Sequence, residues 1–258
     1  MQKKILVTNL IPTYNEKENI DKLINKLLDL GKKNKRYEFQ ILIVDDNSPD
    51  GTSEIVKKYK KKYKNIFLLS HKREGLGKAM IRGTNYCIQK LHSDVIISNE
   101  ADFSFDLNKI LYMLKKIDEG HDVVIASRHV NGAKIYNWPK IRKFNHFVSN
   151  HIFARLVAGS RFYDNNGAMR AIRVKDVMDK INLDKFRLKG YSFFNYSLFK
   201  LSIVTSKIYE FPASYHHRKK GQSKIGVKYL KTYYEDTKEY IQLCFKIRYE
   251  RLVNKTNS

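Results

Sequence analysis

The sequence predicts an α/β fold in which a mostly parallel central sheet is flanked by helices. Short β-rich runs alternate with longer amphipathic stretches through the first half of the chain, which is the pattern of βαβ units. A polar or glycine-containing motif follows most of these β-rich runs. With 258 residues, the chain is long enough to bury a full core beneath such a sheet.

The β-rich runs predict strands, and the helical spacing of apolar residues predicts helices between them. The expected strands cover 5–11, 41–44, 66–69, 95–98 and 123–126, and the expected helices cover 18–30, 53–63, 77–91 and 107–117. A polar, aromatic stretch over 127–139 is typical of a functional loop. Amphipathic helices are expected over 144–156 and 229–253. We expect a catalytic domain over 1–224 and a C-terminal helix and tail over 225–258.

The charge of the chain predicts an anionic partner or substrate. Lys and Arg number 50 and Asp and Glu 26, which gives a formal net charge of +24. Nucleic acid, an acidic membrane surface and a diphosphate substrate all agree with this excess. Part of it, such as the lysines over 57–64, is also explained by a solvated helix face.

The cysteines and the hydropathy pattern indicate a reducing compartment and no spanning helix. Cys87 and Cys244 are far apart and belong to no metal-binding cluster, so neither a disulfide framework nor a zinc site is indicated. No window approaches 18 uninterrupted apolar residues. The first residues lack the apolar core and cleavage site of a secretion signal. We therefore expect a cytoplasmic protein.

Two motifs at the ends of the first and second strands are candidates for binding a nucleotide. Pro12, Tyr14 and Glu16 can hold a planar base and a ribose, although an ordinary loop in which Asn15 caps the next helix explains them equally well. Paired carboxylates such as Asp45 and Asp46 are costly to place together unless a cation or a donor-rich ligand uses them. Either aspartate could accept from a base N–H or approach a metal.

A glycine-rich turn precedes the third helix. Gly77 permits close backbone approach, and Lys78 offers a cation to phosphate. The spacing is not that of a P-loop, so it does not indicate ATP hydrolysis. A plain glycine-rich turn remains an alternative.

Glu100 and Asp102 follow the fourth strand at alternate positions. In extended backbone their carboxylates point to one side and can share a hard divalent cation, with Ser104 and water as completing ligands. All-oxygen ligation suits Mg²⁺ or Mn²⁺. Such a cation would bridge a diphosphate and stabilise its departing charge. A pair of solvated loop acids is the alternative.

The second half of the chain supplies cations. Loop positions predicted to bear them are Arg128, Arg142, Arg170, Arg218 and Lys224. The planar fork of arginine binds phosphate oxygens in pairs. The segment 216–224 is strongly basic and contains one glycine, which indicates a mobile clamp that closes on an anionic ligand.

These motifs, in this order, resemble glycosyltransferase family 2, and within it the dolichol-phosphate mannosyltransferase-like enzymes. The resemblance runs from about residue 5 to residue 224 and implies the GT-A fold. It implies that Pro12, Tyr14 and Glu16 contact the nucleoside together with Asp45. It places the family's metal motif on Glu100, Ala101 and Asp102, with Ser104 following.

By the same resemblance, four cations grip the phosphates of donor and acceptor: Arg128, Arg142, Arg218 and Lys224. Asp102, Arg128 and Arg218 are thus expected at the catalytic centre. The chain departs from the family pattern at Glu100, where the family has aspartate, and at Phe105, where it often has histidine. Residues 165–170 also replace the usual Thr-Gly-Ser/Gly-Phe-Arg pattern. The extra methylene of Glu100 would leave Asp102 as the main metal ligand.

The resemblance implies that mannose moves from GDP-mannose to a polyprenyl (dolichyl-type) phosphate with inversion. An ionised phosphate is already a nucleophile, so no strong general base is needed. Helix 144–156, and with it the helix over 229–253, would rest on the cytosolic face of a membrane as a peripheral anchor. The alternative is that both apolar faces pack on the sheet. One alternative is a family 2 enzyme that uses UDP-glucose and a soluble or polysaccharide acceptor. Another is a basic nucleic-acid-binding module, for which no recognised motif is present.

Overall fold

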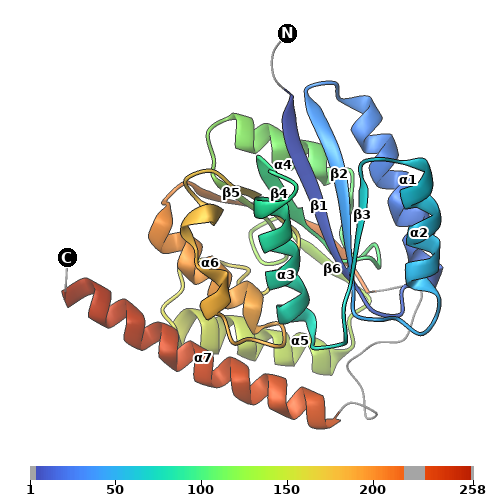
Figure 1. The fold of residues 1–258 in the computed structure, drawn as a ribbon. Helices are drawn as coiled ribbons and strands as arrows, with labels where there is room; N and C mark the ends of the chain where they lie inside the picture. Colours follow the sequence, from blue (N-terminus) through green and yellow to red (C-terminus); the bar gives the residue numbers. More distant parts are fainter. Residues whose placement is uncertain (1–3, 218–229, 257–258) are drawn as a thin grey trace.

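The computed structural model describes residues 4–217 and 230–256, and these form a mixed α/β fold around one large sheet (Figure 1). The seven strands are ordered β3-β2-β1-β4-β7-β5-β8. Only β7 runs antiparallel to its neighbours β4 and β5, while the other pairs in this sheet are parallel. The predicted fold class is confirmed.

The large sheet contains β1 Ile5–Thr13, β2 Tyr37–Asp45, β3 Ile66–Ser70, β4 Val95–Ser98, β5 Val123–Ser127, β7 Arg170–Arg173 and β8 Ile208–Pro212. A small parallel sheet pairs β6 Lys134–Tyr136 with β9 Ser214–His216. The α-helices are α1 Lys17–Lys33, α2 Thr52–Lys62, α3 Leu76–Gln89, α4 Lys109–Asp118, α5 Lys140–Phe147, α6 Ser192–Val204 and α7 Leu230–Thr256. A π-helix, η1 Val148–Val157, continues α5, and short 3-10 turns occur at η2 Met178–Lys180 and η3 Leu183–Lys185.

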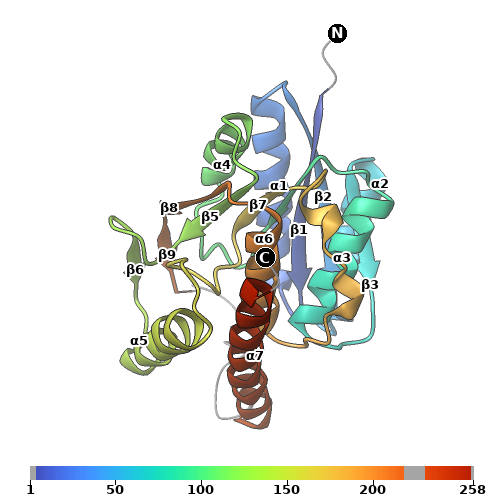
Figure 2. The ribbon, with the colours of Figure 1, turned by 90° about the vertical axis from the view of Figure 1, so that its left-hand side faces the viewer.

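Alternation along the central strands divides the core into two layers. Leu10 and Leu42 face one side of the sheet and pack in a cluster with α3, α6 and α7. Ile11 and Ile41 face the other side, toward α1, α2 and α4. Helices therefore cover both faces, which leaves the strand ends as the places where loops can form a site (Figures 1 and 2).

Several elements differ from the sequence prediction. The helix expected over 144–156 begins at Lys140 and becomes a π-helix from Val148. The stretch 127–139 is not entirely loop, because it contains β6, which lies with α5 to one side of the main sheet (Figure 2). No elements were predicted at β7, α6, β8 or β9. The strands among them are short. Nine of the thirteen residues of α6 are buried, polar ones included, so α6 shows no apolar stripe at helical spacing.

The C-terminal helix is not amphipathic in the expected way. Tyr240, Cys244 and Ile247 on one face are buried against the rest of the fold. Phe245 and Tyr249 on other faces are exposed. Apolar side chains therefore point in opposed directions, and a single apolar stripe is absent from the part of α7 whose side chains are described. The proposed domain boundary at 224 lies outside the described residues.

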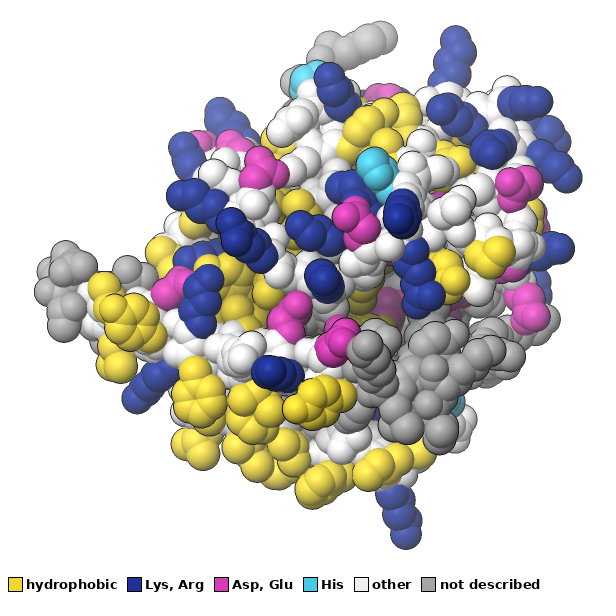
Figure 3. Space-filling view, turned by 60° about the horizontal axis from the view of Figure 1, so that its bottom comes forward, with side chains coloured by type: hydrophobic (Ala, Val, Ile, Leu, Met, Phe, Trp, Pro, Cys, Tyr) yellow, Lys and Arg dark blue, Asp and Glu magenta, His cyan; other side chains and the backbone are white. Residues whose placement is uncertain are grey.

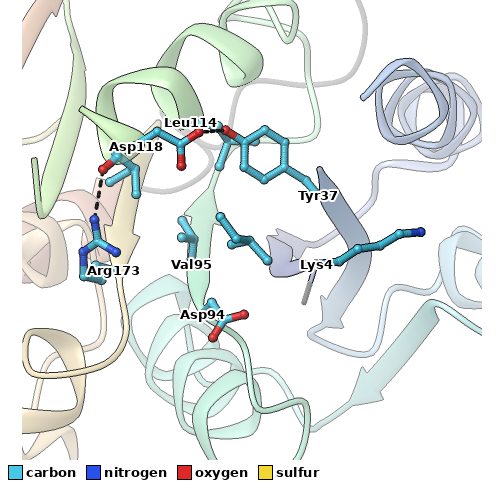
Figure 4. A pocket seen from close by; sticks show the side chains of 9 residues that line it. Lys4, Tyr37, Asp94, Val95, Leu114, Asp118 and Arg173 are labelled. Atoms are coloured by element: carbon cyan, nitrogen blue, oxygen red, sulfur yellow. Dashed lines mark hydrogen bonds between the residues drawn. The ribbon is translucent and has the colours of Figure 1, made fainter. Parts of the chain in front are cut away.

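A cavity of about 240 Å³ lies at the amino ends of β1 and β4 (Figure 4). Its polar groups are already paired: the Tyr37 hydroxyl donates to Asp118 over 2.5 Å, and Asp94 accepts from the Leu6 N–H over 2.8 Å. Arg173, at its edge, donates to the Ile117 carbonyl over 2.9 Å. This cavity is at the opposite end of the sheet from every motif that the sequence singles out.

Candidate functional site

The predicted site residues gather at the carboxyl ends of the parallel strands. Thr13 of β1 lies beside Asp45 of β2, and Leu10 of β1 lies beside Ser98 of β4. Because β7 is antiparallel, its first residue, Arg170, lies beside Ser98 at this same edge. Ligands of open α/β sheets bind at such an edge.

Asp45 shapes the loop after β2. It is fully buried, and its oxygens accept four hydrogen bonds: from the hydroxyls of Thr13 (2.8 Å), Ser48 (2.6 Å) and Ser53 (2.8 Å), and from the Ser48 N–H (2.9 Å). A carboxylate that accepts from this many donors is held in one orientation. Asp45 therefore fixes the position of its neighbour, Asp46.

Asp46 connects this loop to the glycine-rich turn. Its carboxylate accepts from the Gly75 N–H over 3.3 Å and from the guanidinium of Arg82 over 3.4 Å. Burial raises the pKa of Asp46, and the nearby Arg82 opposes that rise. Sequence reasoning missed Arg82, which lies in the middle of α3 and looks like an ordinary exposed helix residue.

Tyr14 and Glu16 lie where the first loop turns into α1. The guanidinium carbon of Arg73 is 3.9 Å from the centre of the Tyr14 ring, so two loops meet through a cation–π contact. Glu16 is buried and occupies the N-cap position of α1. Its carboxylate accepts a hydrogen bond from the side-chain amide of Asn19. The alternative in which Asn15 caps the helix is therefore wrong. Pro12 is half-buried at the end of β1.

The glycine-rich turn has a packing role. A Cβ at Gly77 would lie 2.5 Å from the Leu188 carbonyl oxygen, and one at Gly75 would lie 2.6 Å from that of Lys189. The Gly77 N–H donates to the Lys189 carbonyl over 2.8 Å, so this amide takes part in packing the turn against residues 188–189. Lys78 is half-buried on the first turn of α3.

The acidic loop after β4 is compact. Residues 101 and 102 form a turn and do not continue the extended strand as expected. Asp102 is 7% exposed, and its carboxylate accepts from the Ser104 N–H over 3.0 Å. Phe103, between them, has a left-handed φ of 58°. A non-glycine residue in that region indicates a loop held by its surroundings.

Buried polar atoms in this loop fit a hard cation or an oxygen-rich ligand. Among the described residues, the Ser104 hydroxyl and both side-chain polar atoms of Asn99 are buried without a hydrogen-bond partner. Together with Asp102 and the half-buried Glu100, Ser104 offers only oxygen donors, which suit Mg²⁺ or Mn²⁺. Asn99 was missed, although its place directly after a buried strand was a usable signal.

Tyr215 joins the acidic loop to the basic part of the site. It lies on β9, where the His216 N–H donates to the Ser104 carbonyl over 2.9 Å. Its hydroxyl is 3.5 Å from both the Glu100 carboxylate and the Arg142 guanidinium. Burial, followed by the charge of Glu100, raises the pKa of Tyr215 to about 12. The sequence analysis assigned this residue no role.

Arg128 forms a buried ion pair with Asp164. Its Nε and Nη2 donate to the two carboxylate oxygens, each over 2.7 Å, and its backbone N–H donates to the same group over 2.9 Å. Burial alone would lower the pKa of Arg128, but Asp164 more than offsets it, so that pKa is raised; the pKa of Asp164 is lowered, because Arg128 outweighs its burial. Asp164 was missed in the sequence.

Arg142 is positioned by aromatic groups. Its guanidinium carbon is 4.6 Å from the centre of the Trp138 ring, and its Nη1 donates to His217 Nδ1 over 2.8 Å. The structure therefore brings Arg142 and Arg128 together around Trp138 and Tyr215. Arg218 and Lys224, which were predicted to join them, lie outside the described residues.

Arg170 was expected in a loop with access to phosphate, and this is wrong. It is 1% exposed, and its guanidinium donates to the carbonyls of Phe194 (2.6 Å) and Asn165 (2.8 Å). Burial lowers its pKa to about 10. Arg170 holds α6 and the 164–166 loop against β7.

A His–His–Asp group lies next to the ion pair. His129, His146 and Asp164 have potential ligand atoms within 4.8 Å of one another, and His129 Nε2 is 3.1 Å from His146 Nδ1. Burial lowers the pKa of both imidazoles, to about 4 for His129. Asp164 already serves Arg128, and imidazoles suit zinc or copper better than Mg²⁺. The oxygen set around Asp102 is the better fit for Mg²⁺ or Mn²⁺.

Comparison with known proteins shows the family. The profile of glycosyl transferase family 2 matches residues 9–179, and the chain belongs to this family. It is 31% identical over 221 residues to undecaprenyl-phosphate mannosyltransferase of Micrococcus luteus, which covers 85% of this chain and 87% of the relative. It is also 31% identical to dolichol-phosphate mannosyltransferase of Pyrococcus furiosus, over 85% of this chain and 59% of that protein. Polyprenol monophosphomannose synthase of Mycolicibacterium smegmatis is 29% identical over 84% of this chain and 80% of its own length.

Solved structures share the fold. Mannosyl-3-phosphoglycerate synthase from Rubrobacter xylanophilus aligns with a TM-score of 0.64 at 16% identity, over 98% of this chain and 76% of that one. A mannosyltransferase from Pyrobaculum calidifontis, in complex with GDP-Man and Mn²⁺, aligns with a TM-score of 0.51 at 16% identity, over 86% of this chain and 59% of that one.

No helix within the described ranges is long and apolar enough to span a bilayer.

Proposed function

We propose that the protein transfers mannose from GDP-mannose to a polyprenyl phosphate with inversion at the anomeric carbon. The observation that carries this proposal is the meeting of an acidic loop, at Glu100 and Asp102, with a basic group, at Arg128 and Arg142, on either side of Tyr215. The acidic side suits a metal-bound diphosphate, and the basic side suits a second phosphate. The names of the three relatives support the choice of sugar and acceptor.

On the donor side, Tyr14, Glu16 and Asp46 are proposed to surround the nucleoside, with Pro12 and Asp45 holding the loops in place. Lys78 lies on the first turn of α3, near Asp46 through the turn at Gly75, and would contact the diphosphate. Asp102, Glu100 and Ser104 would hold Mg²⁺ or Mn²⁺. Such an ion neutralises charge that develops on a leaving diphosphate.

On the acceptor side, Arg142 and Arg128 would bind the lipid phosphate. Arg142 is half-buried, with one guanidinium edge committed to His217 and its flat face to Trp138. Arg128 is fixed by Asp164, and its guanidinium lies near Arg142 around Trp138 and Tyr215. Because an ionised phosphate oxygen can attack directly, this chemistry requires no side chain to remove a proton. Arg218 and Lys224 stay predictions for the same phosphate.

We further propose that α5 and η1 rest on the cytosolic surface of a membrane. Ile141, Phe144 and Leu156 are 67%, 63% and 76% exposed on these helices, and Lys140 and Lys143 are exposed among them. Figure 3, which looks toward the underside of Figure 1, shows hydrophobic side chains gathered there with lysines and arginines nearby. Such a face buries apolar groups among acyl chains and attracts anionic lipid.

A direct test incubates the purified protein with radiolabelled GDP-mannose, Mn²⁺ and a short polyprenyl phosphate, and measures label in the organic phase. Labelled lipid is expected, and UDP-glucose should give none. The Asp102→Asn variant should give none either. Transfer of sugar only to a soluble acceptor, or from UDP-glucose alone, would contradict the proposal.

A further inference from the structure

The loop at 164–166 connects Arg128 to the C-terminal helix. Asp164 holds the Arg128 guanidinium, and two residues later the Asn166 side-chain amide donates to the Tyr240 hydroxyl on α7 over 3.1 Å. The Tyr240 hydroxyl in turn donates to the Ser149 carbonyl in the π-helix over 3.0 Å. A phenolic hydroxyl can donate once and accept at the same time, so both bonds coexist.

The loop between these contacts is tightly held. The Asn165 N–H donates to the side chain of Asn150 over 3.0 Å, and Asn150 is fully buried in η1. A Cβ at Gly167 would lie 3.1 Å from the Asp164 carboxyl carbon, so the backbone passes close against that carboxylate. A shift of Asn166 would therefore be transmitted to Asp164 and to its ion pair, because little free volume could absorb it.

The ring and the hydroxyl of Tyr240 have separate roles: the ring packs in the core, and the hydroxyl makes hydrogen bonds. The residue is 8% exposed, and the ring packs in the core cluster that α6 and α7 share. Burial raises the pKa of Tyr240 well above its ordinary value, so the group stays a neutral donor. A phenylalanine would fill the same space and remove the bonds of the hydroxyl to Asn166 and Ser149, together with its contacts to Cys244 and Asn195.

We propose that Tyr240 is a positioning residue for the acceptor, acting through Asn166 and Asp164 on Arg128. The inference rests on the proposed function, since it assigns Arg128 to the lipid phosphate. The same hydroxyl bonds the π-helix, whose Leu156 is part of the proposed membrane surface. Tyr240 thus links the surface that meets the lipid to the arginine that binds the phosphate of that lipid.

The test compares Tyr240→Phe with Tyr249→Phe, a matched control on the same helix whose side chain is 69% exposed. Transfer from GDP-mannose to a short polyprenyl phosphate is measured at varied concentrations of each substrate. Loss of the hydroxyl should raise KM for the polyprenyl phosphate by about three- to tenfold, because the bond to Asn166 carries the connection to Arg128 and a single hydrogen bond contributes on that scale. KM for GDP-mannose should stay within about twofold of wild type, and Tyr249→Phe should match wild type in both.

Asn166→Ala provides a second route to the same contact if Tyr240→Phe folds poorly. It should raise the acceptor KM by a similar factor. The double variant should raise this KM little further, because both changes break the same contact between Asn166 and Tyr240. If the wild type is active and both variants keep its acceptor KM, whatever their Tm, the role of Tyr240 is overturned and the proposed function is not. A wild type that forms no lipid product would overturn the proposed function and this role with it.

Discussion

The acidic and basic parts of the site are built in different ways. Asp45 and Asp102 take their hydrogen bonds largely from nearby positions, with Ser48 three residues and Ser104 two residues away. Arg128 and Arg142 take theirs from Asp164 and His217, which are 36 and 75 positions away. A short loop after a strand thus supplies most of the hydrogen bonds that hold these two carboxylates. The acceptor side exists only after β7, β9 and the π-helix have packed together.

This comparison predicts that changes on the donor side remove activity without unfolding the protein. Asp102 lies in a loop and forms its own local hydrogen bond, so Asp102→Asn should preserve the fold. Loss of the proposed metal ligand should lower kcat by about 100-fold or more, the scale on which electrostatic groups act at a reacting centre. Steady-state kinetics with Mn²⁺, alongside a Tm measurement, checks both statements.

Removal of the metal provides the control for that variant. Chelation with EDTA should abolish transfer by the wild type, and added Mn²⁺ or Mg²⁺ should restore it. If Asp102→Asn keeps full metal-dependent activity, the cation is held elsewhere, and the His129–His146–Asp164 group becomes the next candidate.

On the acceptor side, the comparison predicts that activity and stability fall together at the ion pair. Asp164→Ala leaves the buried Arg128 unpaired, which should lower the free energy of unfolding by about 3–5 kcal/mol. Denaturant unfolding monitored by circular dichroism measures this loss. Asp184→Ala, at a side chain on an exposed 3-10 turn, should change it by less than about 0.5 kcal/mol. Equal effects of the two would show that the pair is not structural.

Within the basic part of the site, a change at Arg142 should weaken acceptor binding without unfolding the protein. It is half-buried, so Arg142→Ala should leave Tm nearly unchanged while raising KM for the polyprenyl phosphate about tenfold, the scale of one charge-assisted hydrogen bond. Lys143→Ala, an exposed neighbour on the same helix, should not alter KM in detergent solution. An Arg142→Ala protein with normal acceptor KM would remove this residue from the site.

A further expected effect is on the pH dependence of stability. Burial lowers the pKa of His129 to about 4, so the unfolded chain binds more protons than the folded one between about pH 4 and the ordinary histidine value near 6.5. The lowered pKa of the buried His146 acts in the same direction. Stability should therefore fall with decreasing pH in that window, by at most about 1.4 kcal/mol per pH unit for each imidazole. His129→Gln should flatten the profile, and an unchanged slope would contradict the assignment.

The sequence predicted the fold, and placed the donor-side candidates at the strand ends, for a physical reason. Strands β1 to β5 and helices α1 to α4 are regular βα repeats, so hydrophobic periodicity and a polar residue after each strand suffice to find them. Asp45, Asp46 and Asp102 were found because they directly follow such strands. The packing of Gly77 against residues 188–189 was not predicted, because no local pattern reveals a contact with so distant a segment.

The acceptor side was only partly accessible from the sequence. Arg128 and Arg142 were identified by residue type and family resemblance, whereas their partners Asp164, Tyr215 and His217 depend on contacts between distant segments. Arg170 shows the converse error, because a polar residue at a predicted loop proved to be fully enclosed. Pairing across the antiparallel β7 decides which arginine is buried, and that pairing has no signature within the four residues of the strand.

The central claim is that the acidic and basic parts act on one sugar between two phosphates. The most direct measurement follows radiolabelled mannose from GDP-mannose into the organic phase with purified wild type, Asp102→Asn and Arg142→Ala. The account predicts labelled polyprenyl phosphate with wild type, essentially none with Asp102→Asn, and recovery of the Arg142→Ala rate at high acceptor concentration. Lipid labelling that is unaffected by either change would contradict it.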